Sequence, residues 1–343
     1  MRTCVWMVRI SNSNFWQLRR RRSSSIAGAS DMPTYRITLN LKGPLGTKMV
    51  SGTFWGHLAW AICYIEGEKS LTRWLEEQET RPWVLSSQMP LGMLPKPLLR
   101  PTLRMDAPPT LKEMQLDKDV RKVSFIPEGL FLDLREGMND VVLNQALKSC
   151  IKQIGVMRGP KGHGLKAHNH IDRLAGTTPD TGGLFFEEVL FSGETRQQVF
   201  LLAPEACKAR LEALCGYVGA SGFGSNASTG NGHFVCTVEE ETTLFAASGN
   251  RAMSLSHGVI SANMRRARYK QHVHFGKLGG DLAKGRHSPF KYPILMASPG
   301  ATFEPGDGGP YGALLRDVHH DPLLVHVRHH AFHLPLAFTE LNP

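Results

Sequence analysis

The sequence predicts an α+β fold with two ferredoxin-like domains and a glycine-rich loop. Residues 34–42 alternate apolar and polar side chains as a half-buried strand does, and residues 51–65 form an apolar run of helical length. A second strand, helix and strand are expected at 197–203, 204–218 and 233–239. The two halves of the chain are expected to share the order strand–helix–strand–strand–helix–strand, which is the ferredoxin-like unit.

The boundaries of these elements follow from turn and cap signals. Gly43 to Gly46 break the first strand, Ser51 is expected to cap the first helix and Gly67 to end it, and Pro204 is expected to open the later helix. The other expectations are a short helix at 71–78, proline-rich extended chain at 83–101, an exposed charged insertion at 102–122, a helix at 139–154, a long aperiodic loop at 158–183, and strands at 269–275, 292–297 and 323–335.

The chain of 343 residues is 41% hydrophobic, which is ample for two domains, and we expect them at 33–240 and 241–343. The formal net charge is +10. Six basic residues and one acid in residues 1–31 give +5, and the 34 basic and 29 acidic residues that follow give the other +5. This modest excess is compatible with a polyanionic partner and equally with an ordinary basic protein.

The N-terminal segment 1–32 is rich in Arg and Ser and nearly free of acid. A mitochondrial transit peptide, a disordered basic arm and a start codon placed too early would each explain it. Regular patterning begins after Met32, so we favour the early start codon. We leave the segment out of the fold prediction.

Cysteine spacing and hydropathy indicate the cellular compartment in which the protein is expected. The six cysteines include no C-x-x-C pair, so neither a zinc knuckle nor a disulfide framework is indicated, and reduced thiols of a cytoplasmic protein are expected. The longest apolar stretch, 53–65, is too short to span a bilayer, so no membrane partner is expected.

The segment 219–232, GASGFGSNASTGNG, holds five glycines with Ser, Thr and Asn between them. Glycines let the backbone approach a ligand closely, and exposed N–H groups in such a loop can bind an anion. A nucleotide-binding P-loop or dinucleotide site needs a strand before the loop and a helix after it, whereas here a helix precedes and a strand follows. Phosphate binding therefore remains open in another context, beside the alternative of a solvated linker.

Several segments together resemble the RAMP superfamily of CRISPR proteins, and among them the fourth subunit of type III-A Csm effector complexes. GFGSNASTGNGHF (222–234) is similar to the RAMP glycine-rich signature. The other matching segments, in order, are LKGPLGTKMVSGTFWGHLAWAI (41–62), LSSQMPLGMLPKPL (85–98), HNHIDRLAGTTPDTGGLFFEEVLF (168–191), KYPILMASPGATFEP (291–305) and HHAFHLPLAF (329–338). The usual glycine loop carries more Arg or Lys than this one, which has neither.

The resemblance implies a non-catalytic subunit that binds the 5′ handle of the guide CRISPR RNA. Its implied partners are the guide RNA, the large polymerase-like signalling subunit and the neighbouring RAMP backbone subunit, and no cofactor or metal is implied. The hairpin near 163–186 would wedge against the guide–target duplex. The expected RNA-binding residues are Lys42, Lys48, Lys166, His168, Asn169, Arg173, Gly222, Phe223, Gly224, Ser228, Thr229, Gly230 and Gly232.

Alternatives stay open at this point. A RAMP endoribonuclease could use a histidine of the 163–170 segment as general acid or base, and an unrelated soluble enzyme could use the glycine loop only as a linker. The histidines of the tail could form a metal site, although no carboxylate stands at ligand spacing. Phe223 is a candidate for base stacking or, equally, a buried anchor of its loop. Trp55, Trp60 and Trp74 have helical spacing and are expected in the core.

Overall fold

The computed structural model describes residues 32–102, 110–158, 162–179, 181–191, 195–204, 207–306 and 308–341. The part from Met32 onward forms one compact unit. Segment 1–31, with the three origins considered for it, lies outside the described residues. Strand and helix both contribute to the described chain, so the predicted α+β class is confirmed.

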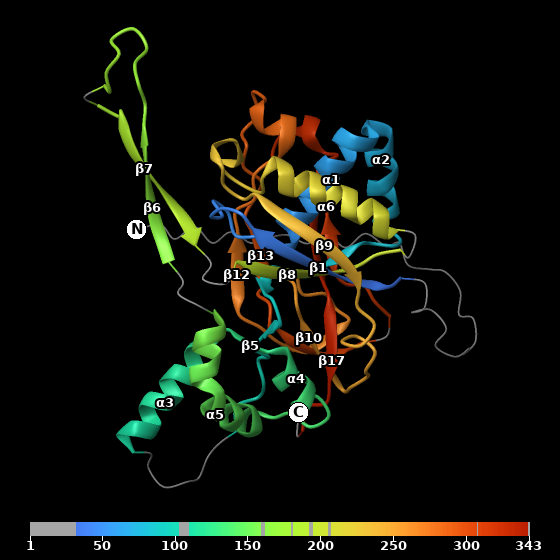
Figure 1. Cartoon of the computed structure of the whole chain (residues 1–343). Coiled ribbons are helices and arrows are strands. Elements are labelled where there is room, and N and C mark those ends of the chain that lie inside the picture. Colours follow the sequence, from blue (N-terminus) through green and yellow to red (C-terminus); the bar gives the residue numbers. More distant parts are fainter. Residues whose placement is uncertain are drawn as a thin grey trace, which may run out of the picture. The chain divides into compact units, whose positions relative to one another are not determined.

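The first sheet is antiparallel and is built around β1 (Thr34–Leu41). This strand pairs with β8 (Arg196–Leu202) on one side and with β9 (Phe234–Glu240) on the other. The short strands β2 (Val84–Leu85) and β3 (Met89–Pro90) pair with the far edge of β8. The order is β2-β8-β1-β9. Figure 1 shows β1, β8 and β9 side by side.

One face of this sheet is covered by α1 (Ser51–Glu66), α2 (Glu68–Glu77) and α6 (Lys208–Ser221). Alternate residues of β1, such as Ile37 and Leu39, pack with them in one hydrophobic cluster. Trp55 and Trp74 are buried there with ring centroids 4.9 Å apart, which confirms the core prediction for both, whereas Trp60 is only partly buried. No helix in the described ranges has the length and apolarity that a bilayer crossing requires.

The second sheet has the order β11-β14-β10-β17, with β10 (Arg251–Ser254), β11 (Met264–Arg268), β14 (Thr302–Pro305) and β17 (Pro335–Phe338). If the strands in each of these two orders are numbered by their position along the chain, both sheets have the order 2-3-1-4. Phe200 from the outer face of β8 shares a hydrophobic cluster with strands β10 and β17. The described residues after 240 contain no α-helix, so this half lacks the helical layer that a ferredoxin-like domain has.

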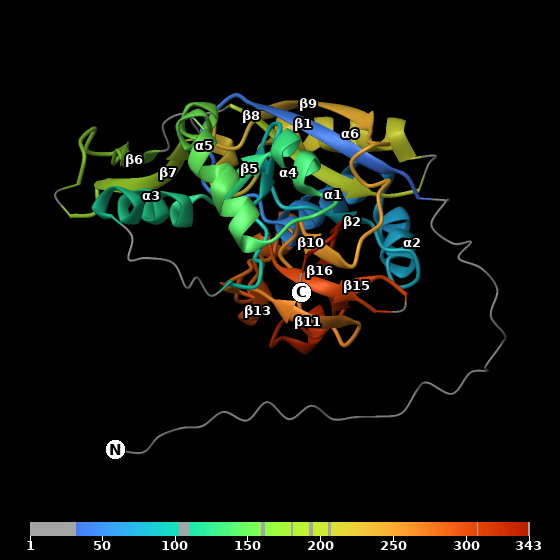
Figure 2. The ribbon, with the colours of Figure 1, turned by 90° about the horizontal axis from the view of Figure 1, so that it is seen from below.

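The remaining elements surround these sheets (Figures 1 and 2). They are β4 (Met93–Pro95), α3 (Leu111–Lys122), β5 (Phe125–Pro127), α4 (Glu128–Leu134), α5 (Asp140–Arg158), the hairpin strands β6 (Gly162–Asn169) and β7 (Leu184–Phe191), β12 (Gln271–His274), β13 (Ile294–Ala297), β15 (Tyr311–Leu315), β16 (His329–His333) and three 3₁₀ turns, η2 (Ala227–Thr229), η3 (Gly280–Lys284) and η4 (Pro322–Leu324). Both views show the β6–β7 hairpin projecting from the rest of the described chain.

Three local predictions are wrong. Part of the predicted loop 158–183 is strand β6, which pairs antiparallel with β7. Ser51 is the first helical residue, and its hydroxyl donates to the His257 carbonyl instead of capping the helix. Helix α6 begins at Lys208, so Pro204 does not open it. The charged insertion is mostly exposed over residues 110–122, as predicted, and it contains α3, which begins with a capping box between Thr110 and Glu113.

Candidate nucleic-acid interface

The glycine-rich segment lies between the end of α6 at Ser221 and the start of β9 at Phe234. Its two ends are held together, because the Phe223 N–H donates to the Gly232 carbonyl over 2.9 Å and the Gly232 N–H donates to the Pro44 carbonyl over 2.8 Å. Gly232 has φ +73°, and a Cβ on it would lie 2.0 Å from the Phe223 oxygen. This close approach explains why glycine is needed there.

Phe223 anchors the loop in the core. Its side chain is 0% exposed and packs in the cluster between β1, α1 and α6. Its ring centroid lies 4.5 Å from that of His57 and 6.2 Å from that of Phe54, both on α1. A ring enclosed in this way presents no face to a base, so of the two roles considered for Phe223 the structure has the buried anchor.

The N–H groups of the glycines expected to cradle phosphate are already bonded. Gly222 donates to Val218, Gly230 to Ala227 and Gly232 to Pro44, all through carbonyl oxygens, and Gly224 donates to Nε2 of His57 over 3.3 Å. Burial lowers the pKa of His57 to about 4, so this imidazole is neutral and its Nε2 can accept. These glycines shape the loop, and their N–H groups are not available to a phosphate.

The exposed tip of the loop offers other donors. Asn226 has a left-handed backbone, φ 56° and ψ 31°, and the 3₁₀ turn η2 follows it. Such a left-handed residue before a helical one turns successive N–H groups toward a common point, where an anion can bind. Within the described chain no hydrogen bond uses the N–H groups of residues 226–228 or the hydroxyl of Ser228. The tip, residues 225–230, is therefore the part of the loop that can receive a phosphate.

The β6–β7 hairpin contacts this tip through two side chains, Lys166 and Glu187. Lys166 Nζ donates to the Thr229 carbonyl over 3.2 Å. Glu187 accepts from the side-chain amides of Asn226 and Asn231, and its other oxygen lies 3.0 Å from Nε2 of His168. The hydrogen bond from Asn226, with a smaller contribution from His168, lowers the pKa of Glu187. The Glu187 carboxylate is thus satisfied by three donors, two amides and the His168 ring.

The other predicted residues fall into two groups. Lys42 and Lys48 are exposed in the chain that joins β1 to α1, whose Thr47 hydroxyl accepts from the Ser225 N–H over 3.1 Å beside the tip. Asn169 and Arg173 lie toward the far end of the hairpin. The turn there is held by Asp172, which accepts from the Leu174 and Ala175 N–H groups. The structure thus brings Lys166, His168 and the loop tip together and leaves Asn169 and Arg173 apart from them.

Apolar side chains are exposed along the same hairpin. Leu165 is 73% exposed and Phe186 60%, and Leu184 and Phe185 are more than half exposed. The Phe185 ring stacks on His168 with centroids 5.2 Å apart and planes 9° from parallel. Exposed aromatic and aliphatic residues on a projecting hairpin are suited to contact with bases or with another protein.

No protein-family model matches the chain, and no curated protein matches it. Solved structures do match. A chain of the Csm1-Csm4 cassette in complex with pppApA has a TM-score of 0.55 and 16% identity, with 91% of this chain and 100% of that one covered. A chain of the Csm3-Csm4 subcomplex of the type III-A CRISPR-Cas interference complex has a TM-score of 0.54 and 15% identity, with 90% and 100% covered. Csm4 is the subunit common to both assemblies. The fold is Csm4-like.

The Csm4-like fold also contains a histidine cluster that sequence spacing did not reveal. His272 and His274 alternate on β12, and ring contacts link them to His257 and His329. Nδ1 of His257 lies 2.7 Å from the Ser87 hydroxyl. Burial lowers the pKa of His257 to about 3 and that of His274 to about 4. No cluster of His, Cys, Asp and Glu among the described residues has a geometry that could hold a metal ion.

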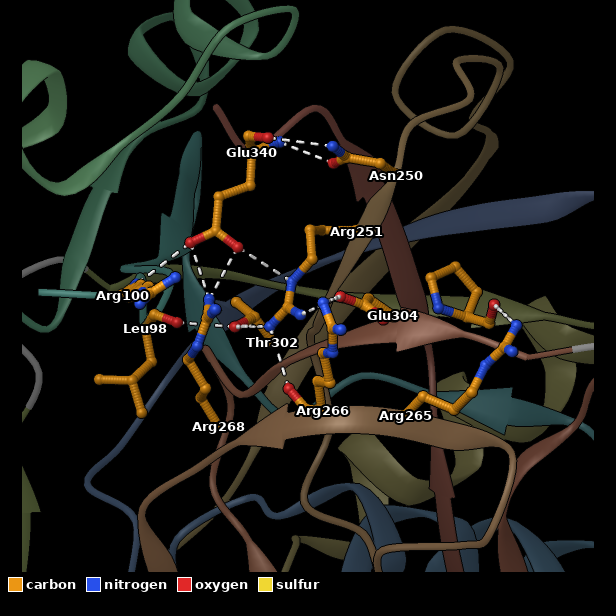
Figure 3. Close-up of polar contacts among 11 residues, drawn as sticks. Leu98, Arg100, Asn250, Arg251, Arg265, Arg266, Arg268, Thr302, Glu304 and Glu340 are labelled. Atoms are coloured by element: carbon orange, nitrogen blue, oxygen red, sulfur yellow. Dashed lines mark hydrogen bonds and ion pairs between the residues drawn. The ribbon is translucent and has the colours of Figure 1, made fainter. Parts of the chain in front are cut away.

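A second unpredicted cluster gathers arginines around two carboxylates in the second sheet (Figure 3). Glu340 is buried, lies 3.1 Å from Nε of the fully buried Arg251, and accepts from Arg268 over 2.7 Å. Glu304 lies 3.2 Å from Arg266 and 3.5 Å from Arg251. Arg251 and Arg268 are thus engaged by one buried carboxylate, whereas the Arg266 side chain beside Glu304 is 72% exposed.

Proposed function

We propose that this chain is the non-catalytic RNA-binding subunit of a type III-A CRISPR effector complex that binds the 5′ handle of the guide RNA. The observation that carries the proposal is the Csm4-like fold, which extends over nine tenths of the chain and the whole of the matched chains. The solved neighbours come from assemblies with Csm1 and with Csm3. The large signalling subunit and the neighbouring RAMP subunit are accordingly the protein partners that we propose.

The proposed RNA site is the loop tip 225–230 with the cations around it. Single-stranded RNA is held largely through phosphates, which need N–H, hydroxyl and cationic donors. Ser228 supplies a hydroxyl, residues 226–228 supply N–H groups, and Lys166 lies directly beside them, while the Thr229 hydroxyl donates to the Asn226 carbonyl over 2.9 Å and shapes the tip. Lys42 and Lys48 extend the site along the loop after β1, while His168 and Asn169 extend it along the hairpin.

We further propose two ferredoxin-like domains, 33–240 and 241–343, in which the second has lost its helices. The order 2-3-1-4, repeated in the two antiparallel sheets, supports this reading. The hairpin 163–186, with its exposed Leu165, Phe185 and Phe186, is proposed to wedge against the guide–target duplex. No reaction is assigned to the chain.

The test measures binding of a labelled guide RNA with its handle by the full chain, alone and assembled with its two protein partners. Affinity should fall steeply as salt rises, because phosphate contacts release counterions. Lys166→Glu should weaken binding tenfold or more, while Lys69→Glu, the same charge change at an exposed position on α2, should alter it by less than about twofold. Equal affinities of the two variants would refute the assigned site. Cleavage of the RNA by the chain alone, lost in His168→Ala, would instead support the endoribonuclease alternative.

A further inference from the structure

A pocket of about 460 Å³ lies away from the glycine loop, between the chain around β4 and β5 and the turn that follows β13. Three cationic side chains line it, namely Lys96, Arg121 and Lys270, together with Ser124 and Ser298. No carboxylate is among the described residues that line it. A pocket of this size can hold a nucleotide, and its charge selects an anion.

The walls of the pocket are fixed by backbone hydrogen bonds. The Lys96 N–H donates to the Ser124 carbonyl over 2.9 Å, and the Ser298 N–H donates to the Lys270 carbonyl over 2.9 Å. The turn after β13 approaches the Lys96 segment so closely that a Cβ on Gly300, whose φ is +88°, would lie 2.4 Å from the Lys96 oxygen. The three cations therefore come from segments that are tied together, and the pocket is a built feature rather than a gap between loose side chains.

Lys96 is partly buried and is affected by the charge of Lys270, while Arg121 and Lys270 are themselves exposed. Burial lowers the pKa of Lys96, the charge of Asp140 on α5 partly opposes this, and the charge of Lys270 lowers the pKa by a smaller amount. Lys96 Nζ donates to the Val120 carbonyl over 3.1 Å, which leaves two of its three protons for a ligand. A bound phosphate would relieve the repulsion between these like charges and satisfy those donors.

The chain from Lys270 into β12 leads from the pocket toward Lys48, and its two histidines are uncharged near neutral pH because burial lowers their pKa. Lys270 stands just before β12, and Lys270, His272 and His274 fall on one side of that strand by its alternation. The charge of Lys48 acts on His272 and lowers its pKa after burial has done so. Lys48 follows Thr47, which contacts the loop tip through Ser225. The five residues from 270 to 274 span about 13 Å of extended chain at 3.3 Å per residue.

We infer that the pocket of Lys96, Arg121 and Lys270 binds a phosphate group of the same RNA, at the far end of a path that begins at the loop tip. This inference rests on the proposed function, since it extends the RNA site found there. The ligand chemistry is a phosphate monoester or diester, and its source is a nucleotide of the bound RNA. A free mononucleotide would offer the pocket the same group, and the experiment distinguishes the two.

The experiment measures affinity of the full chain for handle-containing RNA at several salt concentrations. Arg121→Glu and Lys270→Glu should each weaken binding tenfold or more and reduce the slope of log affinity against log salt by roughly one. Lys112→Glu is the matched control, because it makes the same charge change at an exposed position of α3, the helix that carries Arg121. It should alter affinity by less than about twofold. Thermal melting of each variant confirms that the fold is intact.

Three outcomes would overturn the inference, and each has a different meaning. If Lys166→Glu weakens RNA binding and both pocket variants bind like the parent, the proposed function stands and the pocket is not on the RNA path. If the parent itself shows no salt-dependent RNA binding, the proposed function fails and the inference fails with it. If titration with AMP shows binding that Lys270→Glu abolishes while RNA affinity is unchanged, the pocket is a site for a free nucleotide.

Discussion

Replacement of Phe223 with alanine tests whether its ring stabilises the fold or stacks on an RNA base. The ring is 0% exposed and lies between Phe54 and His57 of α1. Truncation of a buried Phe to Ala costs about 3–5 kcal/mol, because apolar surface returns to water and a cavity remains. The Phe223 N–H also pairs with Gly232, so loss of the ring would loosen the base of the glycine loop.

The expected result for Phe223→Ala is a fall in the thermal unfolding midpoint of roughly 6–20 °C, taking 2–4 °C per kcal/mol for a domain of 150–250 residues. Phe186→Ala is the control, since it removes the same ring from an exposed site on the hairpin. It should change the midpoint by only a few degrees. Differential scanning fluorimetry of the parent and both variants makes the comparison.

RNA affinity, measured on folded protein below the midpoint, completes the test. If Phe223 stacked on a base, its removal would cost about 1–3 kcal/mol of binding and leave stability unchanged. A Phe223→Ala variant that melts like the parent and binds RNA more weakly would refute the anchor assignment. Loss of stability with RNA affinity retained on the folded fraction would support it.

Three further predictions concern stability. Gly230→Ala should lower the free energy of unfolding by about 1–2 kcal/mol, because the left-handed φ of +94° is unfavourable for alanine although no atom lies within 4 Å of the added Cβ. Gly232→Ala adds a clash with a carbonyl oxygen and should lower the free energy of unfolding clearly more. Equal losses in urea denaturation would contradict the loop geometry. Glu340→Gln should destabilise the chain by about 3–5 kcal/mol, because it removes the buried carboxylate that pairs with both Arg251 and Arg268 and leaves Arg251 with the more distant Glu304 carboxylate at 3.5 Å. An unchanged urea midpoint would rule this out. Burial lowers the pKa of His330 to about 3 from an unfolded value near 6.5, so on acidification the unfolded chain binds a proton before the folded chain does. This histidine should therefore lower the free energy of unfolding by about 1.4 kcal/mol per pH unit as pH falls from 6.5 toward 3. Melting temperatures that stay constant from pH 7 to pH 4 would disprove this.

The sequence alone determined the local elements whose periodicity is strong. The alternation of Ile37 and Leu39 predicted β1, the apolar run from Ser51 predicted α1, and Phe234 to Val238 predicted β9 with its buried side. These predictions hold because side chains that alternate between core and solvent must follow the period of the backbone that carries them. The order of the segments was also enough to suggest the RAMP resemblance, which agrees with the Csm4-like fold.

Tertiary structure decided what those residues do. Phe223 lies in a polar, glycine-rich stretch, and only the packing of α1 against the loop reveals that its ring is buried. The sequence likewise suggested that the glycine N–H groups are free to bind phosphate, whereas in the structure they donate to Val218, Ala227, Pro44 and His57. Two of these partners, Pro44 and His57, lie far from the loop in sequence, and hydrogen bonds of that kind leave no periodic signal that a sequence pattern could reveal.

The Lys96 pocket depends on tertiary structure most of all. Its cations at 96, 121 and 270 stand in three separate segments, and nothing in the spacing between them indicates that they meet. Backbone pairing of Lys96 with Ser124 and of Ser298 with Lys270 brings them together. The composition gives only the net charge of the chain. The electrostatic potential at a bound anion depends on its distances from the charged side chains, and the fold sets those distances.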